Sequence, residues 1–191
     1  MRSLLVPLAA VAVGWAFSAG DASATTLRPM NTAEMVDLSD LIVRGTVTEV
    51  WTERDADGVI WTRAQVEVAH VYKGDAHTEA LIVDQLGGAW AGLRSDVFSA
   101  ARFSADEDVL LFIDHADRSG RNLPLGMMNG KYTVRLDPYS RAEIVQRFAP
   151  SIDRPYDHRF IPLPDEAHRL KLTDLEAQID ARVRAGSAEV K

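Results

Sequence analysis

The feature that most constrains the fold is a pair of alternating segments joined by a tight turn. Residues 41–51 read LIVRGTVTEVW, in which polar side chains alternate with apolar ones. This period of two predicts a half-buried β-strand. The dipeptide Asp57-Gly58 follows, and residues 60–72 alternate again. An Asp-Gly pair between two alternating runs predicts a long β-hairpin, which we expect to bend at Gly45.

Three further segments have the pattern of strands. Residues 80–86 and 131–136 alternate, and in the second of these we expect Lys131 to face outward. Residues 109–113 read VLLFI, and an unbroken apolar run of this length predicts a strand covered on both faces. Five strands in this order predict a mostly β protein, with a small closed barrel over residues 41–136.

A short helix is predicted before the first strand. Asn31 and Glu34 have the spacing of a capping box, in which each side chain bonds the backbone N–H of the other residue. We expect Met35 and Leu38 to face inward.

A longer helix is predicted at the C-terminal end. Thr173 has the position of an N-cap, Gly186 is expected to end the helix, and the apolar residues between them recur at helical spacing (Leu175, Ile179 and Val183). This apolar stripe should pack against the barrel. Residues 137–164 show little periodicity and predict an irregular excursion.

The first 24 residues have the features of a secretory signal peptide. Arg2 supplies a positive charge, residues 4–17 form an apolar run, and residues 22–24 read ASA, a typical cleavage site. The sequence therefore predicts export, with a mature chain that begins near Thr25 and a periplasmic or secreted location. Because the apolar run is shorter than a membrane-spanning helix, we expect no membrane span after cleavage.

Composition excludes several classes of function. The net charge of −7 argues against non-specific binding to nucleic acid. The absence of cysteine excludes disulfides, thiol nucleophiles, thiolate zinc sites and iron–sulfur clusters. The chain contains no G-x-S-x-G motif and no phosphate loop, so neither a catalytic residue nor a cofactor is predicted.

Tryptophan and glycine residues are the candidate contact residues. Trp51 and Trp61 flank the predicted hairpin, and Gly87, Gly88 and Trp90 belong to a glycine-rich loop. Exposed aromatic side chains beside such a loop favour contact with a ligand or partner. The alternatives are cross-strand packing of the two hairpin tryptophans and a flexible loop that crosses the barrel mouth.

Two acidic segments are weak candidates for a metal site. Asp55 and Asp57 precede Gly58, as in the front half of a calcium loop, but Ala64 stands where the bidentate acid is needed. Asp114 and His115 end the apolar strand, where a carboxylate next to an imidazole suits a metal or a proton-transfer role. A solvated turn and a solvated strand end are the competing interpretations.

Several of these segments resemble a known family. Residues 39–47 are similar to the opening strand of netrin-like modules, which include the tissue inhibitors of metalloproteinases, and residues 66–74 are similar to their second strand with its Lys-Gly turn. Residues 107–112 and 130–132 resemble uncharacterised exported bacterial proteins of the same layout. The resemblance implies an OB-like five-stranded β-barrel with a C-terminal α-helix packed against it. The inhibitors use an N-terminal cysteine, which this chain lacks, so their activity is not carried over.

These observations predict four regions: a signal peptide at 1–24, a segment with a short helix at 25–40, the barrel at 41–136, and the excursion with the final helix at 137–191. The favoured function is that of an exported, non-enzymatic binding or protein-interaction module. Its partner would be another envelope or extracellular protein, or a small ligand. The alternatives are a metal-binding or metal-assisted envelope enzyme and a structural component of an envelope assembly.

Overall fold

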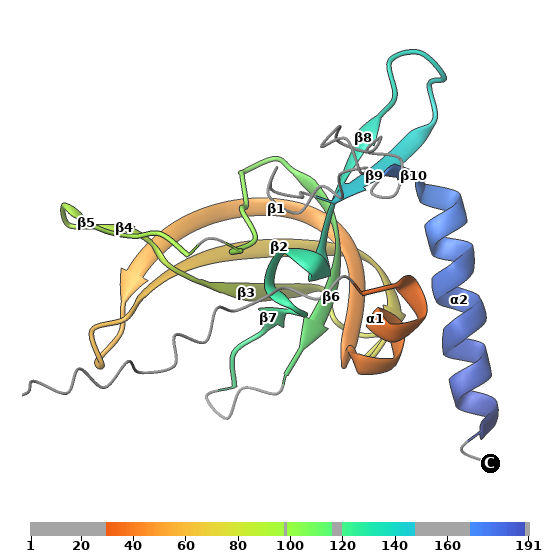
Figure 1. The fold of residues 1–191 in the computed structure, drawn as a ribbon, viewed down its shortest axis with the longest axis horizontal. Coiled ribbons are helices and arrows are strands. Elements are labelled where there is room, and N and C mark those ends of the chain that lie inside the picture. Colours follow the sequence, from red (N-terminus) through yellow and green to blue (C-terminus); the bar gives the residue numbers. More distant parts are fainter. Residues whose placement is uncertain (1–29, 98, 116–119, 148–168, 190–191) are drawn as a thin grey trace, which may run out of the picture.

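The protein is mostly β, with a short helix before the strands and a long one at the C-terminal end, as predicted (Figure 1). The computed structural model describes residues 30–97, 99–115, 120–147 and 169–189. The predicted signal peptide and residues 148–168 of the predicted excursion lie outside this described part. The helices are α1, Thr32–Leu38, α2, Leu172–Glu189, and the 3-10 helix η1, Met127–Gly130. The strands are β1, Leu41–Arg54; β2, Ile60–Lys73; β3, Ala80–Leu86; β4, Gly88–Trp90; β5, Leu93–Ser95; β6, Asp108–Asp114; β7, Leu123–Pro124; β8, Lys131–Leu136; β9, Glu143–Arg147; and β10, Arg169–Lys171.

One antiparallel sheet contains all the strands except β4 and β5, which pair with each other. Its order is β10-β9-β8-β6-β1-β2-β3, and β7 pairs with β6. Among the described residues this path is open, with β10 and β3 at its ends, so the ladders do not form a closed ring.

The predicted hairpin forms, and both of its strands curve strongly (Figure 1). The register between β1 and β2 shifts at three places, one of them between Arg44 and Gly45. At Gly45 the two backbones approach so closely that an added Cβ would lie 2.2 Å from the carbonyl oxygen of Glu67. The glycine therefore permits the close approach at the predicted bend.

Strand β6 separates two apolar clusters, which confirms that its apolar run is covered on both faces. Val109, Leu111 and Ile113 point into the inner cluster, between β6 and the β1–β2–β3 wall. Leu110 and Phe112 point into the helix-side cluster, beneath α1 and α2. The inner cluster also contains Leu41, Val43, Val47, Ala64, Val66, Leu81 and Val83, and the helix-side cluster also contains Met35, Val36, Ile42, Leu125, Tyr132, Val134, Val145, Leu172, Leu175 and Ile179.

Helix α1 begins with the predicted capping box. The amide of Glu34 donates to Asn31 Oδ1 at 2.9 Å, and the amide of Asn31 donates to Glu34 Oε2 at 3.1 Å. Met35 is buried as predicted, but Leu38 is 57% exposed and Val36 is buried instead. The prediction for Leu38 was wrong because α1 packs through two adjacent side chains and ends at Leu38 itself.

Helix α2 packs its apolar stripe on the helix-side cluster, as predicted, but both predicted ends were wrong. The helix begins at Leu172, which is buried, so Thr173 lies inside it rather than at the N-cap. It also continues through Gly186 to Glu189. A single glycine costs a helix only about 1 kcal/mol, which is too little to end this one.

Two expectations for the region around β8 were also wrong. Residues 143–147 form β9 and pair with β8, so this part of the predicted excursion is regular sheet. The turn between these strands begins at Asp137, whose Oδ1 accepts hydrogen bonds from the next two backbone amides after Pro138. Lys131 is 8% exposed rather than outward-facing, because its ammonium group pairs with Glu107.

Candidate functional site

Asn122, in the segment before β7, joins this segment to the outer backbone edge of β3. The amide of Asp84 donates to the carbonyl of Asn122 at 2.8 Å, and Nδ2 of Asn122 donates to the carbonyl of Ile82 at 2.8 Å. Since these backbone groups of β3 bond Asn122, they point away from β2. Beside this contact the edge continues toward Ala80 without a paired strand among the described residues.

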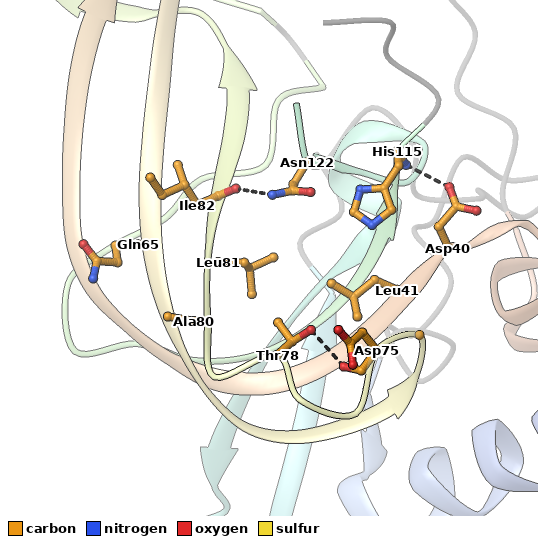
Figure 2. Close-up of a pocket in the computed structure, with 11 residues that line it drawn as sticks. Asp40, Leu41, Gln65, Asp75, Thr78, Ala80, Leu81, Ile82, His115 and Asn122 are labelled. Atoms are coloured by element: carbon orange, nitrogen blue, oxygen red, sulfur yellow. Dashed lines mark hydrogen bonds between the residues drawn. The ribbon is translucent and has the colours of Figure 1, made fainter. Parts of the chain in front are cut away.

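A pocket of about 690 Å³ lies along this part of the edge (Figure 2). Its apolar portion comes from Leu41 at the start of β1 and from Leu81, both of which also belong to the inner cluster. The pocket therefore opens from the interior of the curved sheet to its surface. The other lining residues are Asp40, Gln65, Gly74, Asp75, Thr78, Ala80, Ile82, His115 and Asn122.

Local hydrogen bonds position the polar residues around this pocket. The carboxylate of Asp40 accepts the backbone N–H of His115 at 2.9 Å, which holds the start of β1 against the end of β6 (Figure 2). On the other side, the hydroxyl of Thr78 donates to the carbonyl of Asp75 at 2.8 Å. Gly74 has a φ of +101°, a value that glycine adopts without strain, and it begins the turn that carries these two residues.

The pocket combines an apolar interior with a polar, acidic rim. Asp40 and Asp75 supply two carboxylates, and His115 supplies an imidazole. The exposed backbone edge of β3 adds hydrogen-bonding groups at strand spacing. This combination suits an extended polypeptide better than a compact nonpolar ligand, because backbone groups and side chains are both available for contact.

The three predicted tryptophans do not lie on one face. Trp51 pairs with Arg63, and Trp61 pairs with Glu53, so both indoles are on the outer face of the hairpin. Trp90 lies on the other side of the hairpin, with the guanidinium of Arg54 5.8 Å from its ring.

Trp61 is covered rather than free. Its Nε1 donates to Asp55 Oδ2 at 2.8 Å, and the guanidinium of Arg121 lies 4.1 Å from its ring centroid. The same guanidinium also reaches Asp84 at 3.4 Å. Trp61 is therefore part of a packed polar network on the outer surface of β2 and β3, and we do not retain it as a ligand anchor.

The predicted glycine-rich loop is a small hairpin, not a flexible crossing. Its turn has positive φ at Ala91 and Gly92, as in the tight turns that join antiparallel strands. Gly88 packs against the hairpin, where an added Cβ would lie 2.6 Å from Thr62 Oγ1. The carbonyl of Gly87 accepts a hydrogen bond from the same hydroxyl at 2.7 Å. Gly88 thus permits close packing of β4 on β1 and β2, whereas Gly87 permits a close approach to β5, where an added Cβ would lie 2.6 Å from the carbonyl oxygen of Ser95.

The predicted metal candidates are dispersed, and Asp55 already has several hydrogen-bond donors. Trp61, Val59 and Asp57 donate to Asp55, and these bonds, with the indole first, lower the pKa of its carboxyl. His115 lies at the pocket, whereas Asp55 and Asp57 belong to the β1–β2 turn. Asp114 is the last residue of β6. Within the described part of the chain, no group of three or more His, Asp or Glu side chains is placed to hold a metal ion.

Sequence reasoning missed most of the pocket residues. Asp40, Asp75, Leu81 and Asn122 come from four separate segments, and none of them belongs to a motif with a functional spacing. The sequence signals near them are the weak candidate His115 and the turn after β2, which the Lys73-Gly74 pair marks.

Comparison with known proteins adds no assignment. No family model matches the chain, and no curated protein has a significant match to it. No helix in the described part has the length and apolarity required to cross a membrane.

Proposed function

We propose that this protein is an exported, non-enzymatic binding module with an OB-like barrel, and that it receives an extended segment of a partner protein along the outer edge of β3. The observation that carries the proposal is the pocket of about 690 Å³ beside that edge. Addition of a strand to an exposed sheet edge is a common mode of peptide recognition, in which backbone hydrogen bonds give affinity and pockets give specificity.

The path of the sheet supports the barrel part of the proposal. β1 pairs with β2, β2 with β3, and β6 with both β7 and β1. Asn122 bridges the remaining interval between β3 and β7 with its two hydrogen bonds. Strands β1, β2, β3, β7 and β6 would thus form a ring in which only β3 and β7 are not paired directly. Such a ring is consistent with the partly open barrel of OB folds, which bind ligands on one face and its adjoining loops.

The chemistry of the pocket favours a segment with apolar and basic residues. An apolar side chain would fill the space between Leu41 and Leu81. A lysine or arginine of the same segment would face Asp40 or Asp75 at the rim. The partner is therefore another envelope or extracellular protein rather than a nucleic acid, because the carboxylates of Asp40 and Asp75 at this rim would repel a nucleic-acid backbone.

The binding test starts from the chain that begins at Thr25. Nine-residue peptides selected from a displayed random library would be measured by fluorescence polarisation. We expect the selected peptides to alternate apolar and basic residues, and Ala80→Trp, which fills the pocket, to weaken binding at least tenfold. The matched control is His77→Trp, which adds the same side chain to the adjacent turn outside the pocket lining.

Two results would refute this function. Peptides with N-methyl groups on alternate amides lose the hydrogen bonds of strand addition, so equal binding of methylated and unmethylated peptides contradicts the proposed mode. Hydrolysis of the peptide by the purified chain contradicts a non-enzymatic role. Export is tested separately, by the N-terminal sequence of the protein purified from the producing cells, and an intact Met1 contradicts it.

A further inference from the structure

A second, smaller pocket of about 190 Å³ lies beside β8 and shares no residue with the pocket at the edge of β3. Its polar lining comes from the segment before β6 and from one face of β8. The polar residues are Arg102, Ser104, Glu107, Lys131, Thr133 and Arg135.

Lys131 is the buried charge of this pocket. Its side chain is 9% exposed, and Nζ lies 2.6 Å from Glu107 Oε1 and 3.4 Å from Thr133 Oγ1. Nζ also lies 5.1 Å from the ring centroid of Phe103, which covers it from another side. An ammonium group carries three N–H donors, so these two acceptors leave one donor for a ligand.

Glu107 holds this arrangement through three hydrogen bonds to its carboxylate. Its Oε1 accepts from Lys131 and from the hydroxyl of Thr133, and its Oε2 accepts the backbone N–H of Ser104 at 3.2 Å. The carboxylate therefore orients the ammonium group and neutralises one positive charge of the pocket.

Two further cations line the same pocket. Among the described residues, neither Arg102 nor Arg135 forms an ion pair with a carboxylate. Burial lowers the pKa of Lys131, Glu107 opposes this effect, and the nearby charge of Arg135 lowers the pKa further. The pocket lining thus contains three cations and one carboxylate. Asp96 lies outside this lining, and the charge of Arg102 helps to lower the pKa of the Asp96 carboxyl, so Asp96 offsets part of the charge of Arg102. An anion in the pocket would relieve the repulsion that remains.

We propose that this pocket binds a single small oxyanion of the phosphate or sulfate class, held by Arg102, Lys131 and Arg135. Guanidinium groups bind the oxygens of such anions in pairs, and an ammonium group adds a point charge. One water molecule occupies about 30 Å³ in the liquid, so a pocket of about 190 Å³ has room for one tetrahedral ion together with a small group attached to it.

The test is isothermal titration of the chain from Thr25 with sodium phosphate at constant ionic strength. We expect saturable binding to one site. Arg135→Gln and Arg102→Gln each remove one charge-assisted hydrogen bond, so we expect each to raise the Kd for phosphate roughly tenfold or more. Both side chains are exposed, so these variants should fold normally, which circular dichroism would verify. The control is Arg184→Gln, the same change on the exposed surface of α2.

Two further arms distinguish the source of the anion. Binding of both phosphate and glycerol phosphate supports a site for phosphomonoesters, and binding of inorganic phosphate or sulfate alone supports a site for the free ion. Absence of saturable binding to all three ligands overturns the proposal. It is also overturned if the Kd of Arg135→Gln and of Arg102→Gln equals that of the wild type.

Discussion

Two regions of the outer surface of the sheet are covered by chain segments that come from elsewhere in the sequence, and they are covered by opposite means. Helix α2 lies beside α1 and contacts β9, β10 and β2 (Figure 1). It buries apolar side chains such as Leu175 and Ile179 in the helix-side cluster. Over β2 and β3, the side chain of Arg121 covers Trp61 and Asp84 with charge and a stacked guanidinium. The first cover depends on buried area, and the second depends on the geometry of a few polar atoms.

This difference has consequences for stability. Apolar burial is non-directional, and its contribution to the free energy of unfolding is proportional to the buried area. Many side chains therefore contribute to stability in the helix-covered region. In the region covered by Arg121, Asp84 has a side-chain exposure of 7% and depends on Arg63 and Arg121 for its hydrogen bonds. Loss of one partner there leaves a buried charge less compensated.

The largest effect is expected in the helix-covered region. Leu175 is fully buried, so Leu175→Ala should lower the free energy of unfolding by about 2–5 kcal/mol through lost burial and the remaining cavity. Leu38→Ala is the matched control, because Leu38 is 57% exposed on α1, and its effect should stay within about 0.5 kcal/mol. Urea denaturation measures both. Equal effects would mean that α2 does not cover this face in solution.

The next effect is expected at Asp84. The change Asp84→Asn keeps the shape but removes the charge that pairs with two arginines, so we expect a loss of about 1–3 kcal/mol. Asp96 provides the control, since it pairs with Arg94 at 2.6 Å but both side chains are more than 60% exposed, at 67% and 69%. Asp96→Asn should therefore lower the stability much less than Asp84→Asn does, because solvent screens an exposed ion pair. If both variants lose the same stability, burial is not what makes the Asp84 network important.

The difference between cover by apolar burial and cover by polar contacts also explains how much of the structure was predictable from sequence. Periodicity identified the β1–β2 hairpin, the doubly covered β6 and the apolar stripe of α2, because each is a local pattern that reflects apolar burial. It did not identify Lys131 as buried, since a lysine at an alternating polar position is normally solvated and its partner Glu107 is distant in sequence.

The polar contacts by which Arg121 covers Trp61 and Asp84, called the polar cover below, and the candidate pocket were not predictable for a related reason. Arg121, Asp84 and Trp61 meet only because Arg121 and Asn122, just before β7, lie against β3 in the folded protein. The pocket likewise joins residues from the start of β1, the β2–β3 turn and Asn122. No spacing rule relates residues that become neighbours only through sheet topology, so these sites become visible only in the folded structure.

A smaller effect should separate the charge of Arg121 from its shape. Arg121→Lys keeps the positive charge but loses the planar guanidinium that stacks on Trp61 and bonds Asp84. We expect a loss of roughly 0.5–1 kcal/mol, the usual worth of a cation–π contact near the surface. Tryptophan fluorescence should change as well, and the change should disappear in a Trp61→Phe background. A fluorescence change that persists there would place the affected indole elsewhere.

The smallest predicted effect is the pH response of Asp55, which anchors Trp61 from the turn between β1 and β2. Hydrogen bonds from the Trp61 indole, then from the Val59 and Asp57 amides, and the charge of Arg121 lower the pKa of Asp55 in the folded protein. A group with a lowered folded pKa stabilises the fold above its unfolded pKa, which is about 3.9 for aspartate, and loses that contribution as the pH falls through the folded value.

This contribution should therefore be complete at neutral pH and disappear only in acid. A carboxyl NMR titration of Asp55 should give a midpoint below the ordinary value of 3.8. Trp61→Phe removes the hydrogen bond that lowers the pKa of Asp55 most and should raise that midpoint toward 3.8. An unchanged midpoint in Trp61→Phe would show that the indole does not hold the carboxylate, and that the polar cover depends on Arg121 and Asp84 alone.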